Sequence, residues 1–148
     1  MIAWHYTTGE KFELIQQSGV LLPADIGVEP PELPIIWFSL APYYENSARK
    51  GIPDESGQAY RAATVEEMYE LGDGLYRFGC PISKLLTGER LRKAAKMSMI
   101  QWKRLVKKAQ HMKASPGDWW GLPGNSLEIA GLHIETMDPD MKWRPLRA

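Results

Sequence analysis

The first 23 residues constrain the fold more than any other stretch of this chain. Ile2 to Tyr6 is short, aromatic and apolar, which is typical of a β-strand. Thr7 and Glu10 have the spacing of a capping box, so a helix is expected to begin there and to end at Gly19. A strand that leads directly into a capped helix, followed by a second extended run, indicates helices that pack on a sheet.

The rest of the chain alternates between short strands and helices. Extended segments are expected at 35–40, 75–80, 127–129, 132–135 and 142–146. Helices are expected at 64–71, after a second capping box, and within 83–113, with a short helix or turn at 43–49. Loops are expected at 23–34, 50–63 and 115–124. The sequence therefore predicts an α+β single domain over residues 1–148, with a mixed or mainly antiparallel sheet and flanking helices.

Composition narrows the classes of function. The formal net charge is zero, so no global basic field points to nucleic acid. Cys80 is the single cysteine, which excludes an internal disulfide and fits a reducing compartment. No apolar run is long enough to span a bilayer and the N-terminus lacks secretory features, so we expect a cytoplasmic location and no membrane contact. The histidines and the cysteine lack metal-ligand spacing, so no metal is expected.

His5 is the leading candidate for chemistry. It lies in the first strand just before a helix cap, between the aromatic residues Trp4 and Tyr6. From the end of a strand, its ring could point into a cleft, where it could bind a ligand or act as a general acid or base near neutral pH. A packed histidine with a hydrogen bond to the backbone is the structural alternative, and the sequence leaves both open.

Further candidates follow in the second and later strands. Trp37 could stack on a flat ring, or it could belong to the core. Tyr43 and Tyr44 could stack or donate a hydroxyl, and Glu45 could hold ligand hydroxyls or act as a base. Glu128 lies between two apolar residues of an expected strand, so it points either to solvent or into a cleft.

A basic surface is expected on the long helix near the end of 83–113. The chain has no acidic residue between positions 90 and 117. The apolar residues follow helical spacing on one face, and Lys103, Arg104, Lys107, Lys108 and His111 take the other. This pattern is typical of a solvated helix face, with an acidic partner or a nucleic-acid backbone as the alternative.

Two motifs carry a resemblance to a known family. The strand Trp4-His5-Tyr6-Thr7, followed by a helix and Gly19-Val20-Leu21, resembles the N-terminal signature of ADP-ribosyltransferase-like folds, especially RNA 2'-phosphotransferases and DNA-modifying ADP-ribosyltransferase toxins. The strand at 36–39 and the segment at 43–48 are similar to a motif of poly-ADP-ribose polymerases. The chain also resembles a group of small bacterial and phage proteins that open with Trp-His-Tyr-Thr.

The resemblance implies a split sheet that binds NAD as a substrate. It implies that the catalytic residues are His5, which would contact the nicotinamide ribose, and Glu128, which would hold a ribose hydroxyl in the transition state. The NAD-binding residues would be His5, Tyr6, Thr7, Trp37, Ser39, Tyr43, Tyr44 and Glu45.

The expected activity is transfer of ADP-ribose from NAD to a macromolecular acceptor, either protein or nucleic acid. Two alternatives stay open. One is a non-catalytic interaction protein, such as a phage or toxin-type inhibitor, that binds its partner through the basic helix face. The other is a phosphotransferase acting on RNA ends. It would need a cluster of arginine and histidine side chains around the pocket, and Arg49 and Arg77 are the candidates for it.

Overall fold

The structure is a computed structural model that describes residues 1–146. Its helices, with the short 3-10 turns written η, are α1 (Gly9–Ser18), η1 (Asn46–Ala48), α2 (Val65–Leu71), η2 (Ile82–Lys84), α3 (Gly88–Ala94), α4 (Met99–His111) and η3 (Pro116–Asp118). Its strands are β1 (Ile2–Thr8), β2 (Val20–Leu21), β3 (Ile35–Ser39), β4 (Gly51–Pro53), β5 (Tyr60–Ala62), β6 (Leu75–Pro81), β7 (Leu86–Thr87), β8 (Trp119–Pro123), β9 (Leu127–Glu128), β10 (His133–Met137) and β11 (Trp143–Pro145).

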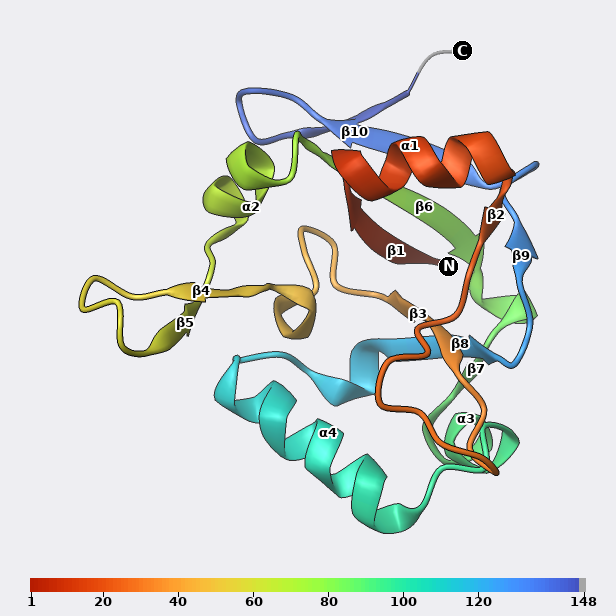
Figure 1. Cartoon of the computed structure of the whole chain (residues 1–148). Coiled ribbons are helices and arrows are strands. Elements are labelled where there is room, and N and C mark those ends of the chain that lie inside the picture. The colour runs from red at the N-terminus through yellow and green to blue at the C-terminus, as the bar shows by residue number, and fades with distance from the viewer. Residues whose placement is uncertain (147–148) are drawn as a thin grey trace.

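A seven-stranded sheet forms the centre of the molecule, in the order β11-β10-β6-β1-β3-β8-β7. Each pairing within it is antiparallel. Strand β1 pairs with β6 from Ile2↔Pro81 to Thr8↔Leu75, but it pairs with β3 only at Trp4↔Ser39. The sheet is therefore split beside β1, with α1 over one half and α3 and α4 beside the other (Figure 1). The prediction of an α+β single domain with a mainly antiparallel sheet is confirmed.

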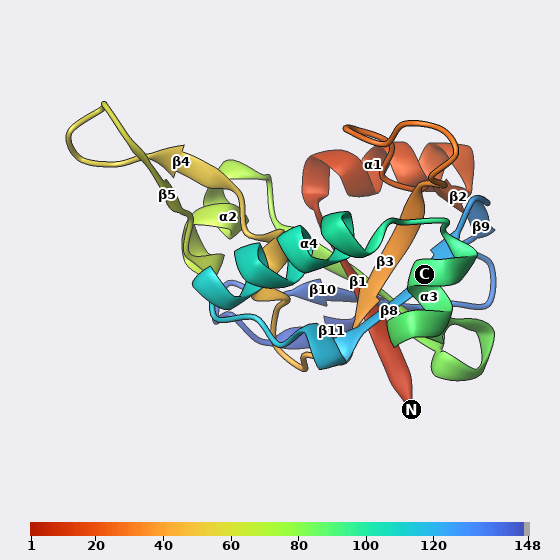
Figure 2. The same ribbon diagram turned by 90° about the horizontal axis from the view of Figure 1, so that it is seen from below.

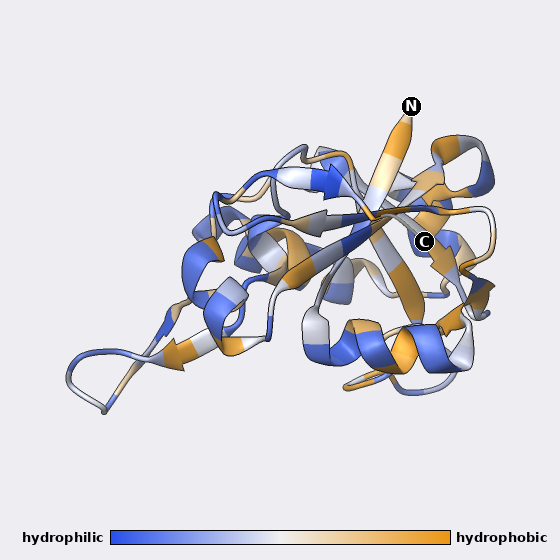
Figure 3. Cartoon of the chain, turned by 90° about the horizontal axis from the view of Figure 1, so that it is seen from above, coloured by the Kyte–Doolittle hydropathy of each residue, from blue (hydrophilic) through white to orange (hydrophobic). Residues whose placement is uncertain are grey.

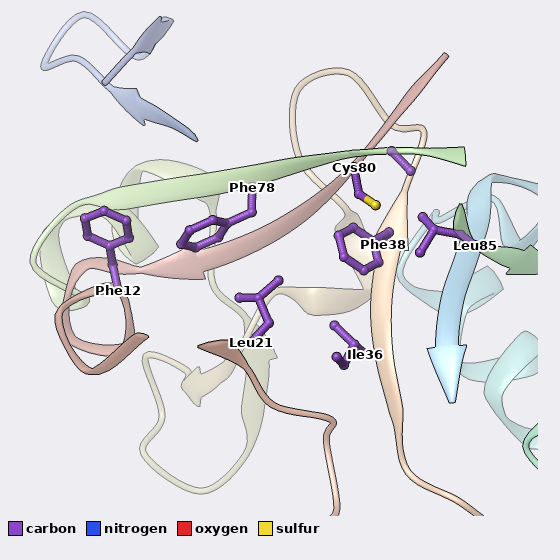
Figure 4. Packing of buried hydrophobic residues seen from close by; sticks show 8 residues of the cluster. Phe12, Leu21, Ile36, Phe38, Phe78, Cys80 and Leu85 are labelled. Atoms are coloured by element: carbon purple, nitrogen blue, oxygen red, sulfur yellow. The ribbon is translucent and has the colours of Figure 1, made fainter. Parts of the chain in front are cut away.

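The main core fills the space between α1 and the two strands next to β1. Phe12 from α1 stacks on Tyr76, with ring centroids 3.9 Å apart, and contacts Phe78. Phe78 and Phe38 are 0% and 2% exposed, so β6 and β3 bury side chains from both halves of the split sheet. Figure 4 shows the rings of Phe12, Phe38 and Phe78 together with Leu21, Ile36, Cys80 and Leu85. Figure 3 shows the matching distribution, with hydrophobic residues concentrated along the central strands.

The start of α1 differs from the prediction. Thr8, not Thr7, is the N-cap, and it makes no side-chain capping hydrogen bond. The amides of Gly9 and Glu10 instead donate to the carbonyls of Gly74 and Gly72, at 2.9 and 3.2 Å. The capping box of Thr7 and Glu10 is therefore wrong, because the turn before β6 supplies the acceptors that a cap would supply. The capping box at the start of α2 is confirmed.

Two segments expected to lack strands contain them. Residues 119–123, within the expected loop 115–124, form β8, which pairs with the whole of β3. Gly121 makes this possible, since a Cβ there would lie 2.7 Å from Cγ2 of Ile35 and 3.0 Å from Leu91 of α3. Residues 51–62, within the expected loop 50–63, form the hairpin β4–β5, which projects from the body of the molecule in two views (Figures 1 and 2).

The later elements are partly as expected. The helical stretch at 83–113 is broken into η2, the strand β7, α3 and α4. Strands β9 and β10 do not pair with each other as a hairpin: β9 pairs with β2 in a separate two-stranded sheet, whereas β10 joins β6. The expected last edge strand is confirmed as β11.

Candidate functional site

A cavity of about 270 Å³ opens where β1 and β3 separate. The strands contribute its inner wall through Trp4, His5, Tyr6, Trp37, Phe38 and Ser39. Because β1 and β3 share a single residue pair, side chains from the middle of β1 and from the end of β3 reach the same space. The split in the sheet is therefore what creates the cavity.

The outer wall comes from later parts of the chain. The segment around η1 contributes Glu45, Ser47 and Ala48, helix α4 contributes Leu105, Lys108 and Ala109, and β8 contributes Trp119. Helix α4 crosses over the strands on this side of the molecule (Figure 2). Most of the lining is aromatic or aliphatic, with a few polar groups, which is the usual character of a small-molecule site.

His5 is held in its neutral form. Its Nδ1 lies 2.8 Å from the carbonyl oxygen of Trp37, and because a carbonyl can only accept, Nδ1 carries the proton and donates it. Burial lowers the pKa of His5 by more than this hydrogen bond raises it, and the charge of Lys11 lowers it further. The neutral ring leaves Nε2 as a hydrogen-bond acceptor, and His5 lines the cavity.

Glu45 is a buried carboxylate whose hydrogen bonds connect three segments of the cavity wall. Its Oε1 accepts from the hydroxyl of Ser39 at 2.8 Å, and its Oε2 accepts from the amide of Ser47 at 3.0 Å. The Ser47 hydroxyl and Nε1 of Trp119 also donate to Oε2, the latter at 3.3 Å. Glu45 thereby links β3, η1 and β8. The residue is 8% exposed, and every one of these donors is neutral.

Three tryptophans pack together next to α4, and two of them, Trp37 and Trp119, line the cavity. Trp37 and Trp119 meet edge to face, with centroids 5.7 Å apart and planes at 68°. Trp102 of α4 packs against both, at 6.5 and 6.1 Å. Because aromatic pairs of this geometry fix the positions of their rings, the cluster sets where α4 lies over the strands.

The loop that carries Glu45 is fastened by three consecutive carbonyls. Tyr6 donates its hydroxyl to Ala41, Arg77 donates from Nη1 to Pro42 at 2.7 Å, and Trp143 donates from Nε1 to Tyr43 at 2.7 Å. Burial raises the pKa of Tyr6 to about 12, against the opposing charge of Arg77, so its hydroxyl keeps the proton that it donates. Side chains from three strands thus fix the loop between β3 and η1.

The structure brings together five of the residues that the sequence singled out. His5, Tyr6, Trp37, Ser39 and Glu45 all line the cavity.

Four other candidates, Thr7, Tyr43, Tyr44 and Glu128, lie outside the cavity lining. Thr7 is buried in the sheet opposite Tyr76, and Tyr44 is buried against Tyr6 and Met68. Tyr43 is 42% exposed, outside the cavity lining.

Glu128 requires a correction. It is exposed on β9, opposite Val20 of the small sheet β2–β9, and it does not line the cavity. The expectation that Glu128 shares a cleft with His5 is wrong, because β9 does not join the central sheet. Arg49 and Arg77 also lie outside the lining, and Arg77 is paired with Glu135.

Sequence reasoning missed Trp119, Ser47 and Lys108 as cavity residues. Trp119 was missed because its strand, β8, contains Gly121 and Pro123, and these residue types are typical of loops. Lys108 reads as part of the basic face of α4, and only the packing of that helix shows that one of its lysines lines the cavity.

No group of three or more His, Cys, Asp or Glu side chains within residues 1–146 is arranged to hold a metal ion. None of the described helices is both long enough and apolar enough to cross a membrane. No family model matches the chain, and neither a curated protein nor a solved structure matches it with significance.

Proposed function

We propose that this protein binds NAD in the cavity between β1 and β3 and is an ADP-ribosyltransferase-like protein that transfers ADP-ribose to a macromolecular acceptor. One observation carries the proposal: residues from two strands and the following loop, which the resemblance implies as NAD contacts, line a single cavity. The aromatic walls suit stacking of a flat ring, and the polar groups at His5, Ser39 and Glu45 suit ribose hydroxyls or a carboxamide.

In this proposal, Glu45 takes the role that the resemblance implied for Glu128. Loss of nicotinamide breaks the glycosidic C–N bond, and the electron pair leaves with the ring nitrogen. Positive charge then develops on the ribose, where a carboxylate stabilises it more than it stabilises the ground state. Glu45 is the only carboxylate among the lining residues that the structure describes. His5 accepts a hydrogen bond from the ligand through Nε2.

The first test is thermal stabilisation by NAD. A ligand that binds only the folded state at 100 times its Kd adds about 2.7 kcal/mol to the free energy of unfolding, so the melting temperature should rise. His5→Ala should abolish this rise, measured against the variant's own ligand-free melting temperature by scanning fluorimetry.

His133→Ala is the matched control, because His133 is exposed on β10 and does not line the cavity. It should keep the full response to NAD. A wild-type melting temperature that does not move at millimolar NAD would overturn the proposal, and so would an unchanged shift in His5→Ala.

A second candidate function is binding of a polyanionic partner through the basic face of α4. Lys103, Arg104, Lys107 and Lys108 are all exposed, and none of them forms an ion pair with another side chain in the part of the chain that the structure describes. Cations without acidic neighbours are free to neutralise phosphates. This face adjoins the cavity, because Lys108 belongs to both.

Charge reversal of Lys103, Arg104 and Lys107 to glutamate tests this function while leaving Lys108 in the cavity wall. Binding of a labelled DNA duplex at low salt, measured by fluorescence anisotropy, should weaken at least about ten-fold, since each phosphate contact contributes to affinity. Reversal of Lys11, Lys50 and Lys84, which changes the net charge equally, should weaken it much less. Equal loss in both triple variants would show that only net charge matters and would remove this candidate.

A further inference from the structure

Helix α4 forms part of the outer wall of the cavity, but few contacts attach it to the body of the protein. All 13 residues of α4 are described, and Ala109 alone among them is buried. Within residues 1–146, no side chain of α4 forms an ion pair or a hydrogen bond with another segment. Trp102 and Leu105 attach the helix through apolar and aromatic contacts. Such contacts are non-directional, so they hold α4 over the strands without locking it there.

A strained residue lies at each end of α4. Lys96, between α3 and α4, has a φ of 55°, and Lys113, just after α4, has a φ of 59°. Both residues follow the end of a helix, where this left-handed conformation is common but is usually taken by glycine. Lysine is disfavoured in it because its Cβ approaches a carbonyl oxygen. Rotation of either residue to negative φ relieves this strain and changes the direction of α4.

The cavity is small for the ligand proposed above. Its volume of about 270 Å³ lies below the range of about 300–1,000 Å³ that is typical of sites for small organic molecules. A dinucleotide is larger than most such molecules. Because α4 contributes Leu105, Lys108 and Ala109 to the wall, an outward movement of this helix enlarges the cavity without separating the strands.

We propose that α4 is a lid, which turns outward about Lys96 and Lys113 to admit a ligand into the cavity and then closes over it. In the closed state, Trp102 packs against Trp37 and Trp119, and contacts with the ligand add to these, so the ligand favours closure. This inference deepens the proposed function and rests on it for the identity of the ligand. The movement itself belongs to the protein alone and is measured first without NAD.

Reaction of a buried thiol with dithiobis(nitrobenzoate) measures the opening. Ala109→Cys places a thiol under the lid, at a position that is 1% exposed. Cys80, the only other cysteine, is 0% exposed in the main core, so its reaction reports unfolding of the whole protein. Local opening is more frequent than global unfolding, so the introduced thiol should react at least about 100-fold faster than Cys80. Should Ala109→Cys not fold, Leu105→Cys gives the same comparison, because Leu105 also lines the cavity.

Glycine at the two hinges distinguishes a moving lid from a static gap in the wall. The double change Lys96→Gly, Lys113→Gly removes the strain of the closed state, so the thiol at position 109 should react about five-fold more slowly or less. Asp73→Gly is the matched control, because Asp73 is also exposed and has a φ of 62°, but lies in the turn before β6. It should leave the rate unchanged. A thiol at position 109 that reacts as slowly as Cys80, or at the same rate with and without the hinge glycines, would overturn the inference.

Addition of NAD separates this inference from the proposed function. A ligand enclosed by the lid should slow the reaction at position 109 about 100-fold at 100 times its Kd, because opening then requires its release. If the lid opens as expected but NAD changes neither this rate nor the melting temperature, the NAD proposal fails and the lid stands. If NAD raises the melting temperature but leaves the rate at position 109 unchanged, NAD binding stands and the lid over that ligand is overturned.

Discussion

Replacing Arg77 with methionine is expected to lower the free energy of unfolding by about 3 kcal/mol or more, because it removes one partner of a buried ion pair. The guanidinium donates from Nε to Glu135 at 2.8 Å and from Nη1 to the carbonyl of Pro42 at 2.7 Å. It also lies over the ring of Trp4, 3.8 Å from its centroid, and 4.6 Å from that of Trp143. Methionine fills similar space but leaves these acceptors without a donor.

Urea denaturation measures this loss. Arg144→Met is the matched control, because Arg144 pairs with Asp138 at the exposed edge of the sheet and its removal should change stability little. The double variant Arg77→Met, Glu135→Gln should recover part of the loss, since it no longer buries an unpaired carboxylate. An Arg77→Met variant as stable as Arg144→Met would show that the contacts of Arg77 with Glu135 and Pro42 do not fasten the loop that leads to Glu45.

Replacing Gly9 with alanine is expected to destabilise the protein by about 2 kcal/mol or more, the effect of overpacking. Helix propensity predicts the opposite sign, because alanine in a helix is favoured over glycine by about 1 kcal/mol. At this position, however, a Cβ would lie 1.8 Å from the carbonyl oxygen of Asp73. That oxygen belongs to the turn that accepts the first amides of α1, so the helix and the turn cannot both stay in place.

Gly117→Ala provides the control for this prediction. A Cβ at Gly117 would meet nothing within 4 Å, and its backbone is not in the left-handed region, so the substitution should be close to neutral. Thermal unfolding of the two variants side by side gives the comparison. A gain in stability for Gly9→Ala would mean that the turn at Asp73 does not pack on the start of α1.

The local pattern of the chain predicted much of the fold. Apolar runs placed β1, β3 and β6, and the capping box of Thr64 and Glu67 placed α2, because these signals depend only on neighbouring residues. The same reasoning missed β8. Its residues are surrounded by glycine and proline, and their conformation is set by pairing with β3 across more than 80 residues of chain, a contact that no local window contains.

The residues of the candidate site were likewise predicted only in part from the sequence. His5, Trp37, Ser39 and Glu45 could be selected from the sequence, because a histidine and a carboxylate near aromatic strands are unusual enough to notice. Glu128 looked equally suitable, since alternation along a strand shows that a side chain leaves the apolar face but not what it faces. Strand β9 pairs with β2, and that single pairing moves Glu128 away from the cavity.

The sequence by itself determined the class of fold, the strands on either side of His5 and the neighbourhood in which a site would form. The tertiary structure alone decided that β1 and β3 separate after one residue pair, that Trp119 and α4 close the resulting space, and that Glu45 is the carboxylate in it. The physical reason is that residue types and their spacing fix local conformation, whereas a cavity is defined by contacts between segments far apart in the chain.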